Sequence, residues 1–240
     1  MQIEQPTKDS VTYHKVMLIP FDPLFYLSDA ENDIAVSTKK NPPATRDNFR
    51  MNIDYQVKRA IGRHRPCIAM LSDLDSMPSL KEALISVYST TGYRYDKPMP
   101  IPFKREITDS TSGKKNKTDK ELLDSKIAAQ YLITKGEAQY MNAIVSKPSV
   151  LDELYNQYET DIFVFINQFE IKTNYSQCLD IANKIYQREV MLHFSIYDKN
   201  GKQLAGAYAS SFFPSNSNNA FDIMKNCFPE LAKFIAMCTP

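Results

Sequence analysis

Two neighbouring segments near the carboxyl end of the chain have the residue pattern of paired β-strands. Between Val190 and Tyr197 a large apolar side chain occupies every second position, which is typical of a strand with one buried face. The Asn200-Gly201 dipeptide that follows favours a tight turn, and an apolar segment from Leu204 to Phe212 comes next. The pattern predicts a β-hairpin, and its small residues Ala205, Gly206, Ala207 and Ala209 leave room for a helix to pack closely on it.

Other segments show the patterns of helices and of short buried strands. Ser79-Leu80-Lys81-Glu82 has the spacing of a capping box, and the helix that it opens is expected to close at Gly92. Apolar residues spaced three and four apart predict further helices at about Asp47 to Gly62, Asp119 to Thr134, Ser149 to Tyr158 and Ala220 to Met237. Apolar runs predict strands at Val16 to Phe21, Cys67 to Leu71 and Asp161 to Thr173.

The order of these segments predicts a single α/β domain over residues 1–240, with a tendency towards α+β. We expect a mixed sheet of about four to six strands with helices packed on it, ending in the carboxy-terminal β-hairpin and a helix. A chain of this length buries enough apolar surface to fold without a disulfide or a structural metal.

Three segments lack a clear period. Residues 24–48 are polar and contain Pro42-Pro43, so we expect a long loop there. Residues 96–118 contain several prolines and more basic than acidic residues nearby, which predicts a basic, flexible insertion. Asn174 to Gln187 fits either a short helix or a loop.

Composition excludes several classes of protein. The chain has 29 basic and 28 acidic residues, which argues against a basic nucleic-acid scaffold. Its apolar runs are far shorter than the roughly 20 residues that a membrane helix needs, and residues 1–12 lack the apolar centre of a secretory signal. The four cysteines show no metal-site or disulfide spacing, so we expect free thiols and no cofactor.

One pair of carboxylates is a candidate metal site. Asp73 and Asp75 follow the apolar run that ends at Leu71, and two carboxylates at the end of a strand can hold a divalent cation. Polar residues also gather at strand-to-helix turns for purely structural reasons, which is the stronger interpretation. The three histidines have no metal-binding spacing, and no nucleotide-binding or nucleophile-elbow motif is present.

Two further groups of residues are candidates for partner binding. The aromatic and aliphatic side chains after the first strand form a candidate interface patch of Phe21, Leu24, Phe25 and Tyr26. The insertion supplies a basic group that an acidic partner could contact, made up of Lys104, Arg105, Lys114, Lys115 and Lys117. This insertion lacks interleaved aromatic residues, so stacking on nucleic-acid bases is not expected.

The order of elements resembles a known superfamily. Its matching segments are the strand Val16 to Phe21, Thr160 to Val164, and the turn from Ile196 to Lys202 followed by Leu204-Ala205 and a terminal helix. Together they are similar to the envelope-protein superfamily that contains the TolB amino-terminal domain, the curli secretion lipoprotein CsgG and the lipoprotein activators of penicillin-binding proteins. The resemblance implies a mixed sheet with helices packed on it, a periplasmic or outer-membrane location, and a non-catalytic role in assembly or protein binding.

Three hypotheses about function remain open at the level of sequence. The first is a non-enzymatic envelope module, of the lipoprotein type, whose partners are other envelope proteins and not nucleic acid. It allows oligomers, and it allows membrane association if a lipid anchor has been removed. The second is a small cytosolic enzyme that uses a divalent cation at Asp73 and Asp75. The third is a subunit of a larger complex in which residues 21–26 are buried against a neighbour.

Overall fold

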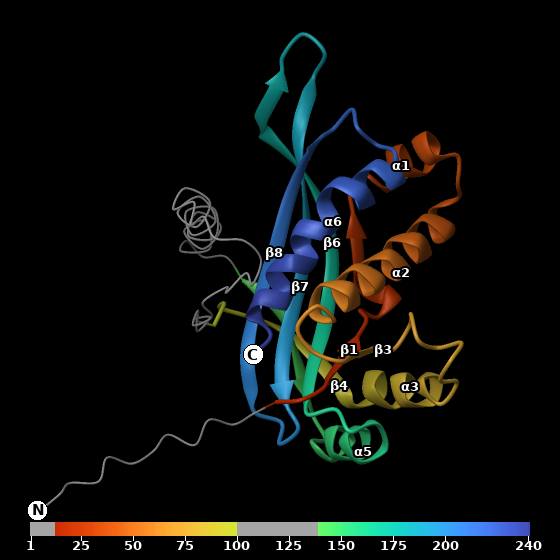
Figure 1. Cartoon of the computed structure of the whole chain (residues 1–240). Coiled ribbons are helices and arrows are strands. Elements are labelled where there is room, and N and C mark those ends of the chain that lie inside the picture. Colours follow the sequence, from red (N-terminus) through yellow and green to blue (C-terminus); the bar gives the residue numbers. More distant parts are fainter. Residues whose placement is uncertain (1–12, 100–138) are drawn as a thin grey trace, which may run out of the picture.

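A twisted mixed sheet forms the centre of the protein in a computed structural model that describes residues 13–99 and 139–240 (Figure 1). The strands of this sheet are β1 (Val16–Ile19), β2 (Tyr26–Ser28), β3 (Cys67–Ala69), β6 (Ile162–Asp180), β7 (Ile185–Asp198) and β8 (Gln203–Pro214). Their order is β3-β1-β6-β7-β8, and β2 pairs with β6 beyond the end of β1. The pairs β3–β1, β1–β6 and β2–β6 are parallel, whereas β6–β7 and β7–β8 are antiparallel.

Helices and a second small sheet cover the two faces of the central sheet. The helices are α1 (Glu31–Thr38), α2 (Pro42–Ile61), α3 (Leu80–Thr90), α5 (Ser149–Tyr158) and α6 (Ala220–Cys238), and a short 3-10 turn spans Pro23–Phe25. The second sheet consists of antiparallel strands β4 (Thr91–Asp96) and β5 (Tyr140–Val145). In Figure 1, α2 and α6 lie across one face of the central sheet.

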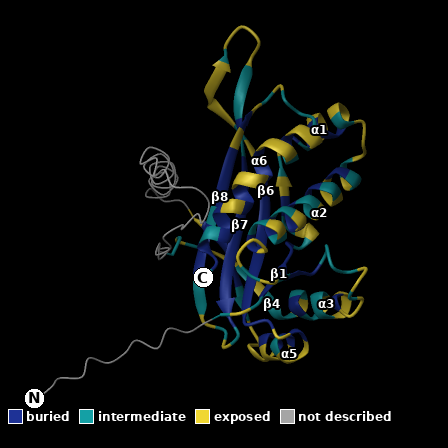
Figure 2. Ribbon diagram, viewed as in Figure 1, coloured by how far each residue is buried: buried dark blue, intermediate teal, exposed yellow. Residues whose placement is uncertain are grey.

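Alternation along the strands creates two hydrophobic cores. In β1, Val16 and Leu18 point to the face that α2 and α6 cover, whereas Met17 and Ile19 join the core formed with α3 and α5. Successive side chains of a strand point to opposite faces, so a strand covered on both faces is apolar at every position. This explains why the first half of β6 is buried throughout, as the dark blue strands of Figure 2 show.

The predicted fold class is confirmed, including the carboxy-terminal hairpin followed by a helix. Strands β7 and β8 pair through the turn that contains Gly201, whose φ of 76° lies in the left-handed region that glycine adopts without steric cost. Helix α6 follows and runs through Pro229 without ending there. Its apolar stripe packs on β7 and β8, where Phe194 and Phe234 make an edge-to-face contact with ring centroids 6.1 Å apart.

The prediction of a long loop over residues 24–48 is wrong. This segment contains the 3-10 turn, β2, α1 and the start of α2, which begins at the proline pair. Asn41 caps α2, since its side-chain oxygen accepts a hydrogen bond of 2.8 Å from the backbone N–H of Ala44. Strand β2 forms because Tyr26 packs on Phe169, with ring centroids 5.1 Å apart. That contact joins residues far apart in the sequence, so the local pattern does not reveal it.

The capping-box prediction is right about the helix and wrong about the cap. Helix α3 begins at Leu80, but the Ser79 side chain makes no capping hydrogen bond. The Ser79 hydroxyl instead accepts a hydrogen bond of 2.9 Å from Tyr158 of α5. Helix α3 ends at Thr90, and Gly92 lies in β4. The predicted helix at Asp119 to Thr134 lies outside the described residues, as does the basic insertion beyond residue 99.

Candidate functional site: the β6–β7 arm

The two carboxylates proposed as a metal site have different surroundings. Asp73 accepts hydrogen bonds from the Lys58 ammonium and, at 2.9 Å, from the backbone N–H of Ala69. It therefore closes the turn after β3, in agreement with the structural interpretation of these residues. Asp75 is exposed two residues further on. Within residues 13–99 and 139–240, no three His, Cys, Asp or Glu residues are grouped so that they could hold a metal ion.

A third carboxylate, which the sequence analysis overlooked, is buried beside this turn. Asp54 of α2 is 1% exposed, and one of its oxygens accepts hydrogen bonds of 2.8 and 2.6 Å from the backbone N–H and the hydroxyl of Ser72. Burial raises the pKa of Asp54 to about 6. Its other oxygen has no hydrogen-bond partner in the described part of the chain. Through these hydrogen bonds Asp54 holds α2 against the turn after β3.

The predicted interface patch is mostly core. Phe21 and Tyr26 are buried among the aromatic rings around Phe169, so they are not available to a partner. Phe25 packs on Tyr93 of β4, with ring centroids 4.5 Å apart. Of the four predicted residues, only Leu24 is fully exposed. The patch fails as an interface because the chain folds back and covers its aromatic members.

The other predicted partner-binding residues are Lys104, Arg105, Lys114, Lys115 and Lys117, and they lie outside the described residues. The described part of the chain has a different basic group, at the end of α2. A hollow of about 560 Å³ is lined by Tyr13, His14, Arg63, His64, Arg65 and Pro66. Arg65 donates to the backbone carbonyl of Tyr13, which ties the loop after α2 to the start of β1. Cations at the end of a helix also complement its dipole.

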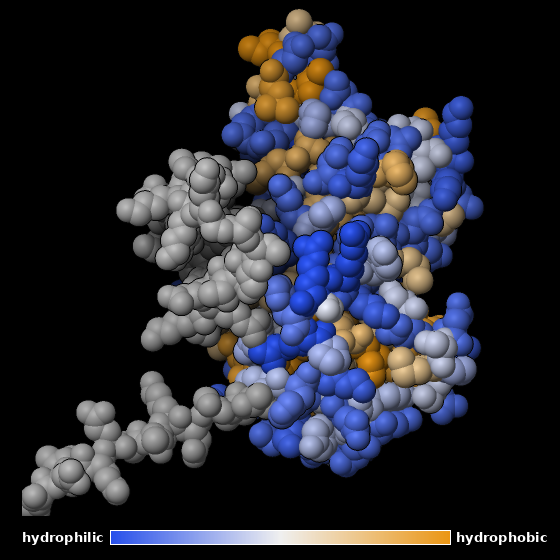
Figure 3. Space-filling view, viewed as in Figure 1, coloured by the Kyte–Doolittle hydropathy of each residue, from blue (hydrophilic) through white to orange (hydrophobic). Residues whose placement is uncertain are grey.

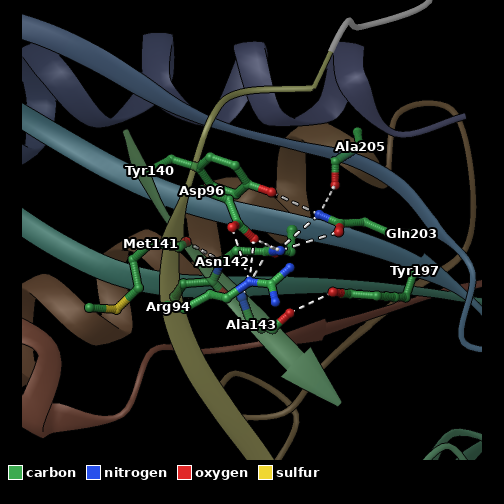
Figure 4. A network of polar contacts seen from close by, with 11 residues as sticks. Arg94, Asp96, Tyr140, Met141, Asn142, Ala143, Tyr197, Gln203 and Ala205 are labelled. Atoms are coloured by element: carbon green, nitrogen blue, oxygen red, sulfur yellow. Dashed lines mark hydrogen bonds and ion pairs between the residues drawn. The ribbon is translucent and has the colours of Figure 1, made fainter. Parts of the chain in front are cut away.

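Buried polar side chains join the second sheet to the central one (Figure 4). Ser195 of β7 accepts hydrogen bonds from the Ala143 backbone N–H at 3.2 Å and from the Asn167 amide at 2.7 Å, and it donates to Asn142 at 2.6 Å. Nearby, a Cβ on Gly206 would lie 2.0 Å from the Tyr140 hydroxyl, so only glycine allows this close approach. These hydrogen bonds fix the position of β5 on β7 and β8.

His193 belongs to the same interface, and its geometry indicates a structural role. Its Nδ1 accepts a hydrogen bond of 2.8 Å from the backbone N–H of Met141. The neutral ring must therefore carry its hydrogen on Nε2, which lies 3.7 Å from a Glu170 oxygen. With one nitrogen occupied by the backbone and the other protonated, the ring presents no free lone pair to a metal ion or a substrate.

The most prominent surface feature is a β-hairpin that extends beyond the body of the molecule. We call residues Asn174 to Gln187 the arm; it comprises the end of β6, the start of β7 and the turn between them. In Figure 1 the arm projects above the helices, and in Figure 2 most of it is coloured as exposed. The residue pattern of this segment allows either a short helix or a loop, and the structure shows two paired strands instead.

The end of the arm carries apolar side chains in open solvent. Ile181 is 85% exposed, Leu179 is 53% exposed, and Ala182 beside them is exposed as well. We call these three residues the tip. Tyr175, which is 71% exposed, lies nearer the body and contacts Tyr186 edge to face, with ring centroids 5.3 Å apart. Figure 3 shows apolar side chains gathered at this end of the molecule.

A buried arginine fastens the base of the arm to the body. Arg188 of β7 is 6% exposed and donates to Asp33 of α1 at 2.7 Å and to the Thr173 hydroxyl at 3.1 Å. It also donates to the side chain of Asn218, in the segment before α6. Asp29 accepts a hydrogen bond of 2.7 Å from the Thr173 backbone N–H on the same side. These contacts hold the direction of the arm relative to α1 and α6.

The arm combines paired strands with an exposed apolar end. It is a hydrogen-bonded ribbon with a fixed base and an apolar end, and contiguous exposed apolar residues mark interaction sites in soluble proteins. A two-stranded hairpin gains little stability by itself in water, so folding alone does not account for its apolar tip. The apolar residues Leu179 and Ile181 are visible in the sequence, but there they are indistinguishable from the apolar residues of an ordinary amphipathic segment. Only their exposure in the structure identifies them as a candidate binding surface.

No family model, curated protein or solved structure matches this chain. Among the helices of the described residues, none combines the length and apolar character needed to cross a bilayer.

Proposed function

We propose that this protein is a non-enzymatic module of the bacterial cell envelope that binds other proteins through the arm. The observation that carries the proposal is the exposure of Leu179 and Ile181 on a ribbon whose base is fixed by Arg188. Burying such side chains against a partner removes apolar surface from water, which is the main favourable term in most protein association. Because the base is held in place, little conformational freedom is lost on binding.

The envelope location in this proposal rests on the sequence resemblance. The resemblance implies a lipoprotein-type component of an assembly, located in the periplasm or at the periplasmic face of the outer membrane. The projecting arm agrees with a role in assembly, since it presents a binding surface at a distance from the body.

Catalysis has less support in the described residues. The carboxylate of Asp73 is held by Lys58, Asp54 is enclosed, and the Nδ1 atom of His193 accepts a hydrogen bond from the backbone. Burial raises the pKa of the Cys67 thiol to about 12, which keeps it protonated at neutral pH. No observation in the described part of the chain favours the enzyme hypothesis over the binding hypothesis.

Site-specific photo-cross-linking in native cells tests the proposal. A photo-reactive amino acid replaces Ile181 at the tip, and a matched variant carries it at Ile85, an exposed apolar residue of α3. We expect discrete adducts from position 181 and none from position 85, in the membrane or periplasmic fraction. Absence of adducts at 181, or equal adducts at both positions, would refute binding through the arm. Adducts at 181 confined to the cytosolic fraction would refute the envelope location alone.

A further inference from the structure

A hollow lined by basic side chains lies far from the arm, at the start of β1. Its volume is about 560 Å³, and its lining residues are Tyr13, His14, Arg63, His64, Arg65 and Pro66. We call this feature the basic hollow, and its size is within the range of ligand-binding sites. Strand β1 begins beside Ile162 of β6, whereas the arm begins at Asn174, roughly 40 Å further along the strand at about 3.3 Å per residue. A ligand of the basic hollow is therefore recognised independently of the arm and of the proposed function.

Two segments that are distant in the sequence form the walls of the basic hollow. One segment precedes β1, and the other is the loop after α2. The guanidinium of Arg65 donates to the backbone carbonyl of Tyr13, and the backbone N–H of Val16 donates to the carbonyl of Pro66 at 3.0 Å. These contacts hold the two walls together before a ligand arrives, so little conformational freedom is lost on binding.

The walls carry positive charge. Arg63 and Arg65 supply two guanidinium groups, which stay charged at every pH that a protein meets. His14 and His64 add imidazole donors, and none of the described residues that line the basic hollow is acidic. Arg63 and His64 are exposed, and within residues 13–99 and 139–240 neither side chain takes part in a hydrogen bond or an ion pair. Both side chains can therefore turn towards an anion.

The end of α2 does not account for these side chains. Cations near the carboxyl end of a helix can interact with its last carbonyl groups, but these carbonyls already have backbone partners. The Lys58 carbonyl accepts a hydrogen bond of 2.8 Å from the N–H of Gly62. The Ile61 carbonyl accepts hydrogen bonds of 2.9 and 3.1 Å from the backbone N–H groups of His64 and Arg65. The helix is therefore closed by the backbone of the loop, without its side chains.

The carboxylates near the basic hollow belong to its support. Asp161 is 8% exposed and accepts hydrogen bonds of 2.8 and 2.9 Å from the backbone N–H groups of His14 and Lys15. It also lies 3.3 Å from Nδ1 of His14, so it orients that ring. Burial raises the pKa of the Tyr13 hydroxyl, and the charges of Asp198 and Asp161 raise it further. The hydroxyl therefore keeps its proton and can donate to an anion.

We propose that the basic hollow binds a phosphate monoester group. The planar guanidinium of Arg63 can donate two parallel hydrogen bonds to phosphate oxygens, and the charge of Arg65 adds to the attraction. A phosphate monoester carries about 1.5 to 2 negative charges at pH 7, which matches two permanent cations better than the single charge of a diester. Soluble phosphorylated compounds and the lipid phosphatidic acid both present this group, and the experiment separates these two sources.

Calorimetric titration of the full chain with glycerol 3-phosphate tests the soluble source. The variants are Arg63→Gln and His64→Gln in the basic hollow, and Arg59→Gln as the matched control. Arg59 lies on α2 outside the lining, and its replacement removes the same charge. We expect the dissociation constant to rise roughly tenfold or more in Arg63→Gln, to rise less in His64→Gln, and to change by no more than about twofold in Arg59→Gln. All three positions are exposed, so circular dichroism should show the same folded state.

Vesicle co-sedimentation with the same variants tests the lipid source. Phosphatidylcholine vesicles that contain phosphatidic acid present the monoester on a membrane, and vesicles with an equal fraction of phosphatidylglycerol present a diester instead. Binding to phosphatidic acid vesicles that Arg63→Gln weakens and Arg59→Gln does not would support the proposal and assign the basic hollow to a lipid headgroup. Binding to glycerol 3-phosphate without binding to either kind of vesicle would support it and assign a soluble ligand.

Three results would overturn the proposal. The first is that neither glycerol 3-phosphate at millimolar concentration nor phosphatidic acid vesicles bind. The second is equal weakening by Arg59→Gln and Arg63→Gln, which would indicate diffuse surface charge in place of a site. The third is equal binding to phosphatidic acid and phosphatidylglycerol vesicles, which would show no selection for the monoester. Photo-cross-linking at position 181 reports on the arm alone, so its outcome does not alter any of these results.

Discussion

Arg188 shows how one side chain can fix the direction of an arm. Its guanidinium reaches α1, β6 and the segment before α6, and each contact uses a different donor of the same planar group. Lysine has the same charge but cannot reproduce this arrangement, because its ammonium is a compact charge on a flexible stem. Position 188 therefore requires arginine because of the planar arrangement of its donors, and a positive charge alone is not sufficient.

Replacing Arg188 should loosen the arm without unfolding the body. The Asp33 side chain is already largely exposed to solvent, so Arg188→Ala does not leave a buried, unpaired carboxylate there. We therefore expect the free energy of unfolding to fall by about 1–2 kcal/mol because of the lost hydrogen bonds. Hydrogen exchange should accelerate in residues 173–188 and stay unchanged in α6. The matched control is Arg46→Ala, which removes a surface ion pair with Glu31 and should cost less than about 1 kcal/mol. Equal exchange in the arm of both variants would contradict this role for Arg188.

Asp54 makes stability depend on pH in a predictable direction. Its pKa is about 6 in the folded protein, compared with roughly 3.9 for an unfolded aspartate. A carboxyl with a raised pKa holds its proton more tightly when folded, so stability falls as pH rises through the window from about 4 to 6. The loss is complete above this window and amounts to about 3 kcal/mol.

The variant Asp54→Asn should therefore gain stability relative to the wild type as pH rises. An asparagine oxygen in the place of the accepting carboxylate oxygen can still accept from both the backbone N–H and the hydroxyl of Ser72. Urea unfolding at several pH values measures the difference, which should grow between about pH 4 and 6 and then level off. A control that removes no titratable group, Ser89→Ala in α3, should show no such change. A difference that is constant with pH would show that Asp54 does not titrate in this window.

At the scale of elements, Ser195 connects the two sheets, and its removal should be costly. Ser195→Ala leaves the Ala143 backbone N–H without its partner, whereas the Asn142 oxygen still accepts from Gln203 and the Asn167 amide still donates to a backbone carbonyl. We expect a loss of about 1–3 kcal/mol in chemical unfolding, since a buried unpaired donor carries its full desolvation penalty. A matched exposed change, Ser89→Ala in α3, should have little effect. Similar losses in the two variants would contradict the network's role.

Elements set by local pattern could be predicted, and elements set by distant contacts could not. The β7–β8 hairpin follows from alternation and the Asn200-Gly201 turn, both of which lie within one stretch of sequence. In contrast, β2 and α1 depend on contacts with Phe169 and Arg188, which lie more than 100 residues away in the sequence. The Ser79 cap failed for the same reason, because a tyrosine of α5 competes for the hydroxyl.

The candidate site could not be predicted from the sequence, because it too depends on contacts between residues that are far apart in the chain. Phe21 and Ile181 are both large apolar residues, and the sequence does not show which of them is buried. Packing in the folded protein buries Phe21 and leaves Ile181 exposed. The aromatic patch expected to be exposed became core, and the segment expected to be an ordinary helix or loop became the exposed arm. Exposure is a property of the whole fold, so a binding surface of this kind needs the structure.

At the scale of the whole molecule, the body and the arm have separate tasks. Both hydrophobic cores lie in the body, between the central sheet and its covering layers, and neither includes the tip. The arm contributes exposed apolar surface and is linked to the body through Arg188 and through two hydrogen bonds between Tyr186 and Ser215. Stability and association should therefore respond to different changes.

Shortening the arm should separate these two properties. Asn174 and Gln187 are paired at its base, so residues 175–186 can be replaced by an Asn-Gly turn that joins the strands directly. We expect the melting temperature to change by no more than about 3 °C, because the main loss is the pair of hydrogen bonds to Ser215. In native cells the shortened chain should no longer associate with the partner that a photo-reactive residue at position 181 captures. A chain that loses its cooperative transition would show that the arm is part of the folding unit, and a shortened chain that keeps its partner would place the interface on the body.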